Sequence, residues 1–263
     1  MNIKGKTVII TGSTGKLARA IVLSLAQSGA NCVCVYNKNS PAAKKLQTSL
    51  KKLKVKTLFI QTDLTKEKNI EKVFAEIEKL GSTGSPQVAK PQILINAAAV
   101  FDKKLITEVA FDYIRYTLDT NFTAPMFITK KFVDFVQRKI KTRQTCPRPR
   151  SGKPVAKIIN ITDITAQNPP AGFSIYSASK AALIAATKSL AKELAPVFTV
   201  NAVSPGIINF AKGTSAELKK KILAHIPAGR TGSPDEIAAA VKFLIENDYL
   251  TGQVINIDGG KTI

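Results

Sequence analysis

The chain has 263 residues, a hydrophobic content of 44% and a formal net charge of +21. A chain of this length can bury roughly 70–75% of the surface that it exposes when unfolded, and its hydrophobic content is too high for a disordered chain. The mean hydropathy is +0.04, and no run approaches the roughly 18 apolar residues of a membrane-spanning helix. Because residues 1–10 lead into a strand-like run instead of a secretory signal, we expect a cytoplasmic protein with no membrane partner.

Cysteine and histidine usage narrows the chemistry further. Cys32 and Cys34 are two residues apart, which places both side chains on one face of a strand and does not suit a disulfide, and Cys146 stands alone in a Pro- and Arg-rich stretch. We therefore expect free thiols in a reducing compartment. His225 is the one histidine and ends a helical run before a proline. We interpret it as a surface or packed helix residue and predict no metal site.

Basic residues outnumber acidic residues by 39 to 18. The densest basic patches, at residues 44–56, 138–153 and 219–221, contain no aromatic side chain. Nucleic-acid-binding proteins usually combine basic residues with aromatic ones, so we interpret these patches as solvated lysine-rich faces and expect no nucleic-acid partner. The positive field would still attract anionic ligands at low salt.

Short apolar strands alternate with amphipathic helices along the chain. In chain order, we predict a strand at 7–10, a helix at 17–27, a strand at 31–36, a helix at 41–53, a strand at 57–61, a helix at 66–80, a strand at 93–95, helices up to 136, a basic linker at 138–154, a strand at 155–161, a helix at 176–194, a strand at 199–203, helices at 215–224 and 234–245, and a strand at 253–257.

This alternation predicts an α/β fold, with a parallel sheet covered by helices on both faces. Right-handed crossovers then give a Rossmann-type doubly wound sheet of about seven strands. No internal repeat or second core divides the chain, so we expect residues 1–263 to form one domain. Ligands bind such a sheet at the carboxyl ends of its strands, near the point where the strand order reverses.

A turn with the sequence TGSTGKLA follows the first strand and opens the first helix. Gly12 and Thr14 lie where backbone N–H groups can approach a pyrophosphate, and the start of the helix at Lys16 and Leu17 favours negative charge. The spacing departs from the usual dinucleotide fingerprint, because Lys16 stands where a glycine is expected. An ordinary strand-to-helix turn is the alternative interpretation.

The segment after the second strand contains Tyr36, Asn37, Lys38 and Ser40. An acidic residue here would bind the ribose 2′-hydroxyl of NAD, whereas a lysine favours the 2′-phosphate of NADP(H). Lys16 can reach the same region, and two ammonium groups form short charge-assisted bonds with a phosphate. We therefore predict NADPH as the cofactor, with an ordinary surface lysine as the alternative interpretation of Lys38.

Tyr176 and Lys180 are four residues apart at a helix start, so their side chains share one face. A phenol with a pKa near 10 is a poor acid–base group at neutral pH. A cation held nearby favours the phenolate, so we expect the pKa of Tyr176 to be lowered toward a useful range. A chance pairing is the alternative, because this spacing is common on helices.

Together these segments resemble the short-chain dehydrogenase/reductase family, over essentially the whole chain. The match in order and spacing rests on residues 11–18, residues 96–99, Asn121, Tyr176 with Lys180, and residues 205–206.

The resemblance implies a role for each matching residue. Tyr176 would donate or accept the substrate proton, Lys180 would bind the nicotinamide ribose and tune Tyr176, Asn121 would hold a water in a proton relay, and Asp63 would contact the adenine. The further cofactor-binding residues that it implies are Leu64, Asn96, Ala97, Ala98, Pro205, Gly206 and Ile208.

The family pattern breaks at Asp163, where most members carry a serine that polarises the substrate oxygen. The pteridine reductases, a branch of the family, have an aspartate there, a basic residue at the position of Lys16 and an aromatic residue at that of Phe101. By analogy Phe101 would stack on a pterin ring; the alternatives are a core aromatic at Phe101 and a strand-end cap at Asp163. The substrate-binding set is Phe101, Asp163, Tyr176, Gly206, Ile207 and Phe210.

The leading hypothesis is an NADPH-dependent reductase of a pterin or folate-like ring, with Asp163, Tyr176, Lys180 and Asn121 as its catalytic residues. The first alternative is an NADPH-dependent carbonyl reductase such as a 3-oxoacyl-[acyl-carrier-protein] reductase, whose acidic carrier would suit a basic surface. The second is a non-catalytic basic binding protein on the same fold. The resemblance also implies a homotetramer paired through the helices that match residues 111–135 and 176–194.

Overall fold

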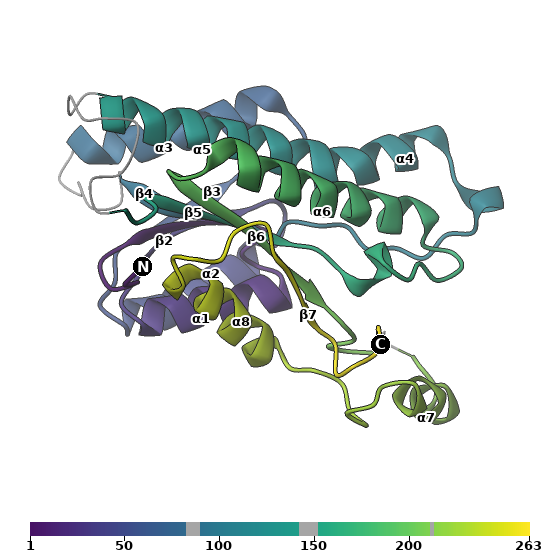
Figure 1. Ribbon diagram of the computed structural model, residues 1–263. Coiled ribbons are helices and arrows are strands. Elements are labelled where there is room, and N and C mark those ends of the chain that lie inside the picture. The colour runs from purple at the N-terminus through teal and green to yellow at the C-terminus, as the bar shows by residue number, and fades with distance from the viewer. Residues whose placement is uncertain (83–89, 142–151, 211–212) are drawn as a thin grey trace.

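The computed structural model describes residues 1–82, 90–141, 152–210 and 213–263 (Figure 1). Its strands are β1 (Thr7–Thr11), β2 (Asn31–Tyr36), β3 (Thr57–Gln61), β4 (Pro91–Asn96), β5 (Ala156–Ile161), β6 (Phe198–Pro205) and β7 (Val254–Ile257). Its α-helices are α1 (Lys16–Gln27), α2 (Ser40–Lys51), α3 (Glu67–Ser82), α4 (Phe111–Leu118), α5 (Ala124–Lys141), α6 (Ser174–Leu194), α7 (Ala216–Ala224) and α8 (Pro234–Glu246). A π-helical turn, Asp119–Thr123, joins α4 to α5.

All seven strands form one parallel sheet in the order β3-β2-β1-β4-β5-β6-β7. The chain moves outward from β1 to β3, returns to β4 on the other side of β1, and then continues to β7. The strand order therefore reverses between β1 and β4, which is where a doubly wound sheet opens a crevice for a ligand. The predicted single-domain α/β fold with a seven-stranded parallel sheet is confirmed.

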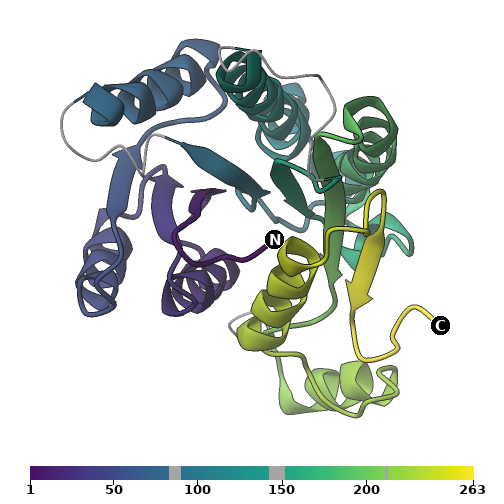
Figure 2. The ribbon, with the colours of Figure 1, turned by 60° about the vertical axis from the view of Figure 1, so that its left-hand side comes forward.

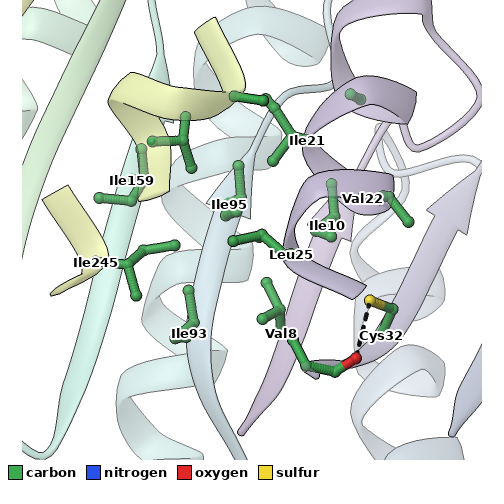
Figure 3. Packing of buried hydrophobic residues seen from close by; sticks show 14 of the residues in the cluster. Val8, Ile10, Ile21, Val22, Leu25, Cys32, Ile93, Ile95, Ile159 and Ile245 are labelled. Atoms are coloured by element: carbon green, nitrogen blue, oxygen red, sulfur yellow. Dashed lines mark hydrogen bonds between the residues drawn. The ribbon is translucent and has the colours of Figure 1, made fainter. Parts of the chain in front are cut away.

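Helices cover both faces of the sheet (Figure 2). Successive residues of a strand point to opposite faces, so Val8 and Ile10 of β1 pack under α1 and α8, whereas Ile9 packs under α3 and α5. Figure 3 shows the first of these cores, with Ile21 and Leu25 of α1 lying over the strands. This double burial explains why the central strands are continuous apolar runs.

Both cysteines of β2 are buried and free, on the same face of the sheet as α1, as their spacing predicts. Burial raises the pKa of Cys32 to about 12 and that of Cys34 well above its usual value, so both thiols are poor nucleophiles. Cys146 lies outside the described residues. His225 is exposed at the end of α7, with Nδ1 2.7 Å from the carbonyl oxygen of Lys221, which agrees with a surface histidine.

Several element boundaries differ from the predicted ones by one or more residues. Helix α2 begins at Ser40, because the side chain of Asn39 accepts a hydrogen bond from Ala42 N at 3.1 Å and Pro41 suits the first turn. Helix α5 continues through Lys141 into the predicted basic linker, and residues 142–151 of that linker lie outside the described residues. In the described part of the chain, no helix is both long and apolar enough to cross a membrane.

Candidate active site

A cleft of about 340 Å³ opens at the carboxyl ends of β1, β2 and β4, where the strand order reverses. Of the cofactor residues predicted from the sequence, those that line it are Gly12, Thr14, Tyr36, Asn37, Lys38, Asp63, Leu64, Ala97 and Ala98. Eight more residues, which were not among the predicted cofactor-binding residues, also line it: Gly15, Asn39, Thr62, Thr65, Ala99, Val100, Tyr116 and Thr120.

The floor of the cleft depends on a close approach between two backbone segments. Gly12 has φ +65°, and a Cβ atom there would lie 2.7 Å from the Cα of Ala98. The hydroxyl of Thr11 accepts hydrogen bonds from the N–H groups of Ala97 and Ala98 at 3.0 and 3.1 Å. Only glycine combines this conformation with this separation, so the turn after β1 is held against the turn after β4.

These features fit a dinucleotide. The glycine turn leaves room for a pyrophosphate beside the first turn of α1, and the buried hydroxyl of Thr120, which lines the cleft, has no hydrogen-bond partner within the described residues. Lys38 is exposed at the edge of the cleft, and the segment of residues 36–40 contains no acidic residue. Asp63 is fixed by the backbone N–H and the hydroxyl of Thr65 at 3.0 and 2.8 Å.

Several predicted cofactor residues lie elsewhere. The expectation that Lys16 reaches the cleft is not met, because it borders a separate groove between α1 and α8. Leu17 packs on the core, and Ser40 donates to Gln61 Oε1 at 3.3 Å. Asn96 is buried, and its amide donates to Asn160 Oδ1 at 2.8 Å, so its contact is with the neighbouring strand.

The remaining predicted residues cluster at the end of β6. Pro205 is the last residue of that strand, and Gly206 N donates to Ile257 O at 2.9 Å. A Cβ atom on Gly206 would lie 2.6 Å from the Cα of Asp258, so this turn also requires glycine. Ile207, Ile208 and Phe210, which follow the turn, are partly buried and do not line the cleft itself.

Tyr176, Asp163 and Lys180 converge beside the carboxyl end of β5. The Tyr176 hydroxyl donates to Asp163 Oδ2 at 2.9 Å, and Lys180 Nζ donates to the carbonyl oxygen of Ile161 at 2.9 Å. Tyr176 and Lys180 lie one turn apart on α6, with the ammonium 5.8 Å from the phenol ring centroid. Asp163 also accepts from Thr165 N at 2.8 Å, so it caps a short 3-10 turn and binds the tyrosine with its other oxygen.

The electrostatics of this group differ from the sequence prediction. A lowered pKa was expected for Tyr176, but burial, then the charge of Asp163, then the hydrogen bond to Asp163 raise the pKa of Tyr176 well above its usual value. A carboxylate disfavours a neighbouring phenolate, whereas a serine hydroxyl would not. The expectation of a lowered pKa is therefore wrong for this arrangement, which keeps Tyr176 as a neutral proton donor.

Burial lowers the pKa of Lys180 to about 8, although the charge of Asp163 acts in the opposite direction. Its cation is therefore lost as the pH rises through about 8, well before that of a free lysine. If Lys180 binds the nicotinamide ribose, kcat/KM for NADPH should fall above pH 8, since this ratio reports ionisations of the free enzyme. Asp163→Asn should move this limb to lower pH. A profile that stays flat to pH 10 in steady-state assays would contradict this prediction.

Asn121 lies in the π-helical turn and is fully buried. Its side chain accepts from Val100 N at 2.9 Å and donates to Val100 O and to Ser179 Oγ at 3.0 and 3.1 Å. Asn121 thus ties the loop after β4 to the helix that carries Tyr176. Ser179 is a participant that the sequence did not single out, although it lies between Tyr176 and Lys180.

An aromatic wall stands next to the tyrosine. Phe101 is 58% exposed, which excludes the core interpretation, and its ring stacks on Phe173 at 4.9 Å and meets Tyr176 edge-on at 4.8 Å. Phe173, three residues before Tyr176, was not predicted as a site residue, although this position could have indicated it. The exposed Phe101 ring and the partly buried Phe173 ring offer an apolar surface beside the proton donor.

Comparison with known proteins places this geometry in a family. Residues 13–262 match the family described as enoyl-(acyl carrier protein) reductase. The 3-oxoacyl-[acyl-carrier-protein] reductase FabG of Aquifex aeolicus is 33% identical over 265 residues, which cover 99% of this chain and 98% of that protein. The chain belongs to the short-chain dehydrogenase/reductase family. Carbonyl reductase family member 4 of Danio rerio is 32% identical and covers 96% of each chain.

Solved structures agree with this assignment. A short-chain dehydrogenase/reductase from Serratia marcescens superposes with a TM-score of 0.83 at 25% identity and full coverage of both chains. A blue fluorescent protein from a metagenomic library, in complex with NADPH, superposes with a TM-score of 0.82 at 27% identity, again over both whole chains. The chain is therefore an oxidoreductase of this family, whereas its predicted resemblance to the pteridine reductase branch stays a prediction.

Proposed function

We propose that this short-chain dehydrogenase/reductase is an NADPH-dependent carbonyl reductase, with 3-oxoacyl thioesters as its first substrate class. The observation that carries the proposal is the neutral phenol of Tyr176, hydrogen-bonded to Asp163 and one helical turn from Lys180. The names of the relatives, a 3-oxoacyl-[acyl-carrier-protein] reductase and a carbonyl reductase, support this substrate class.

In this mechanism, NADPH would supply a hydride to the carbonyl carbon when bound, and the chain would supply the proton. The C=O π bond becomes the O–H bond of the alcohol as the Tyr176 hydroxyl gives its proton to the substrate oxygen. The side chain of Lys180 is anchored on the backbone of β5, so its ammonium is positioned to stabilise the resulting phenolate. Lys38 would bind the 2′-phosphate at the far end of the cleft, and water then reprotonates the phenolate.

The second candidate is the pterin or folate-like reductase, and Asp163 is the observation that favours it. An ionised carboxylate cannot donate a hydrogen bond to a carbonyl oxygen, but it can accept one from a ring N–H. The exposed Phe101 ring, stacked on the partly buried Phe173 ring with an interplanar angle of 18°, would suit a flat heterocycle.

NADPH oxidation assays with acetoacetyl thioesters, dihydrobiopterin and dihydrofolate separate the candidates. The proposal expects turnover of the thioester above that of both pterins; the reverse order would overturn it in favour of the second candidate. No oxidation with any of the three would overturn both.

An Asp163→Ser variant sharpens this comparison. A serine hydroxyl can donate to a substrate carbonyl, and a hydrogen bond to a group that gains charge contributes about 1.5–3 kcal/mol. We therefore expect kcat/KM for the thioester to rise about 10- to 100-fold and any pterin reduction to fall. An unchanged or lower thioester rate in this variant would show that Asp163 does not limit carbonyl reduction.

We also propose a homotetramer. The family resemblance implies this assembly. Contact between copies would bury Ile106, before α4, and Phe111, the first residue of α4, which are 68% and 71% exposed in the single chain. Light scattering at several protein concentrations should give four times the mass of the chain; a monomer mass throughout would contradict the proposal.

A further inference from the structure

The positive charge of this protein is unevenly distributed. The first acidic residue of the chain is Asp63, and eleven Lys or Arg residues precede it. Within the described part of the chain, none of these eleven side chains takes part in an ion pair. The acidic partners of the observed ion pairs all lie between Glu71 and Asp248. The unit from β1 to β3 is therefore a basic surface without internal compensation.

This surface adjoins the proposed cofactor cleft. Lys38 lines the edge of the cleft, and α2 begins two residues later on the same face of the sheet as α1 (Figure 2). Helix α2 buries only Ala43, Leu46 and Leu50, and the lysines of its outer side are exposed. Lysines thus lie at the edge of the cleft (Lys38), in the first half of the helix (Lys44 and Lys45) and at its end (Lys51 and Lys52).

We propose that this surface, residues 38–56, steers the anionic dinucleotide into the cleft and accelerates its binding without contacting it along most of the helix. This inference rests on NADPH as the cofactor. The 2′-phosphate adds about −1.5 to −2 charges to those of the pyrophosphate, and a field of one sign beside a cleft raises association rates by about 10- to 1,000-fold. The exposed side of α2 has no aromatic residue on which a nucleic-acid base could stack, so a small polyanion suits it better.

The expected effect of a lysine pair on the association rate decreases with its distance along α2 from the cleft. At 1.5 Å per residue, Lys44 and Lys45 lie about 6–8 Å along the axis from the start of α2, and Lys51 and Lys52 lie about 17–18 Å from it. The Debye length is about 10 Å at 0.1 M salt and 30 Å at 0.01 M. The near pair should therefore act at both salt concentrations, and the far pair only at the lower one.

Stopped-flow binding of NADPH tests the proposal, with the fluorescence of the nucleotide as the signal, because the chain has no tryptophan. The association rate should fall steeply with salt while the dissociation rate stays constant. Lys44→Gln with Lys45→Gln should lower the association rate at least about threefold at 0.01 M salt and measurably at 0.1 M. Lys51→Gln with Lys52→Gln should lower it only at 0.01 M, and NADH should show a weaker salt dependence than NADPH.

The matched control removes two exposed lysines from the middle and end of α6, by Lys188→Gln with Lys192→Gln. It changes the net charge equally and should leave the association rate nearly unchanged. The proposal would be overturned by a salt-independent association rate, by an equal loss in the α6 control, or by an effect confined to the dissociation rate, which would indicate direct contact. Failure of the chain to bind either nucleotide would instead overturn the proposed function.

Discussion

Replacing Tyr176 with phenylalanine should lower kcat by about 100- to 10,000-fold, the usual contribution of a positioned acid–base group. The substitution removes one hydroxyl and keeps the ring that packs against Phe101. Its loss leaves Asp163 Oδ2 without its donor, but Lys180 still donates to the carbonyl oxygen of Ile161. We therefore expect NADPH to bind with nearly unchanged affinity, measured by nucleotide fluorescence, while turnover of the best substrate is almost lost.

Tyr249→Phe is the matched control, because Tyr249 is 98% exposed and also loses only a hydroxyl. Its turnover should equal that of the original chain. Near-normal turnover in the Tyr176→Phe variant would remove this phenol from the mechanism. Loss of NADPH binding in that variant would show instead that the hydroxyl has a role in shaping the cofactor cleft.

Most of the fold could be predicted from the sequence, because its determinants are local or periodic. Strands buried on both faces appear as continuous apolar runs, and strands β2 and β3 were predicted with the bounds that the structure shows. Most other strand and helix ends differ from the predicted ones by one or more residues. At the start of α2, the hydrogen bond of the Asn39 cap decides the boundary, and hydrophobic periodicity does not report such a bond.

The candidate site was predictable only in part. Residues that directly follow β1, β2 and β4 meet at one edge because parallel strands carry them there. Tyr116 of α4 and Thr120 of the π-helical turn after it reach the same cleft, a placement that depends on tertiary packing. Lys16 borders a different groove for a related reason, since the position of α8 beside α1 decides where its side chain lies.

The effect of Asp163 on the pKa of Tyr176 could not be predicted from the sequence either. The spacing of Tyr176 and Lys180 suggested a cation that lowers the phenol pKa. Burial and the carboxylate of Asp163 outweigh it, and both are properties of the folded chain. The Lys180 ammonium lies 5.8 Å from the centroid of the phenol ring and donates to Ile161 O, and it does not reverse this shift.

A buried lysine in the sheet was also not predicted from the sequence. Lys157 lies on β5 among apolar residues and is 0% exposed. Its ammonium donates to Asn247 O at 2.7 Å and pairs with Asp248 Oδ1 at 2.9 Å. Burial raises the pKa of Asp248, but the Met1 ammonium at 2.8 Å and Lys157 outweigh it, so the pKa of Asp248 is below its usual value. This pair fastens the segment after α8 to the sheet.

Removing one partner of this pair should destabilise the protein strongly. Asp248→Asn leaves the Lys157 ammonium without its counter-charge, and breaking a buried pair in this way costs about 3–5 kcal/mol. Because Asp248 is 24% exposed, water compensates in part, and we expect a loss of about 2–3 kcal/mol in the free energy of unfolding from urea titration. The carboxylate stabilises the fold above its unfolded pKa, so in the original chain this contribution is lost as the pH falls through the lower folded pKa.

The double variant Lys157→Met with Asp248→Asn tests whether the unpaired charge of Lys157 causes the loss of stability. With the Lys157 charge removed as well, much of the lost stability should return, since an apolar side chain can replace a buried ion pair at little cost, while the Met1 ammonium still donates to Glu246 O at 2.7 Å. Asp134→Asn is the matched control: it breaks the Lys130–Asp134 pair, whose side chains are 62% and 45% exposed, and should leave the urea midpoint unchanged. Each protein is measured at one fixed concentration, because assembly would shift the apparent stability. A double variant as unstable as the sum of Lys157→Met and Asp248→Asn measured singly would mean that packing around β5, and not charge pairing, holds this segment in place.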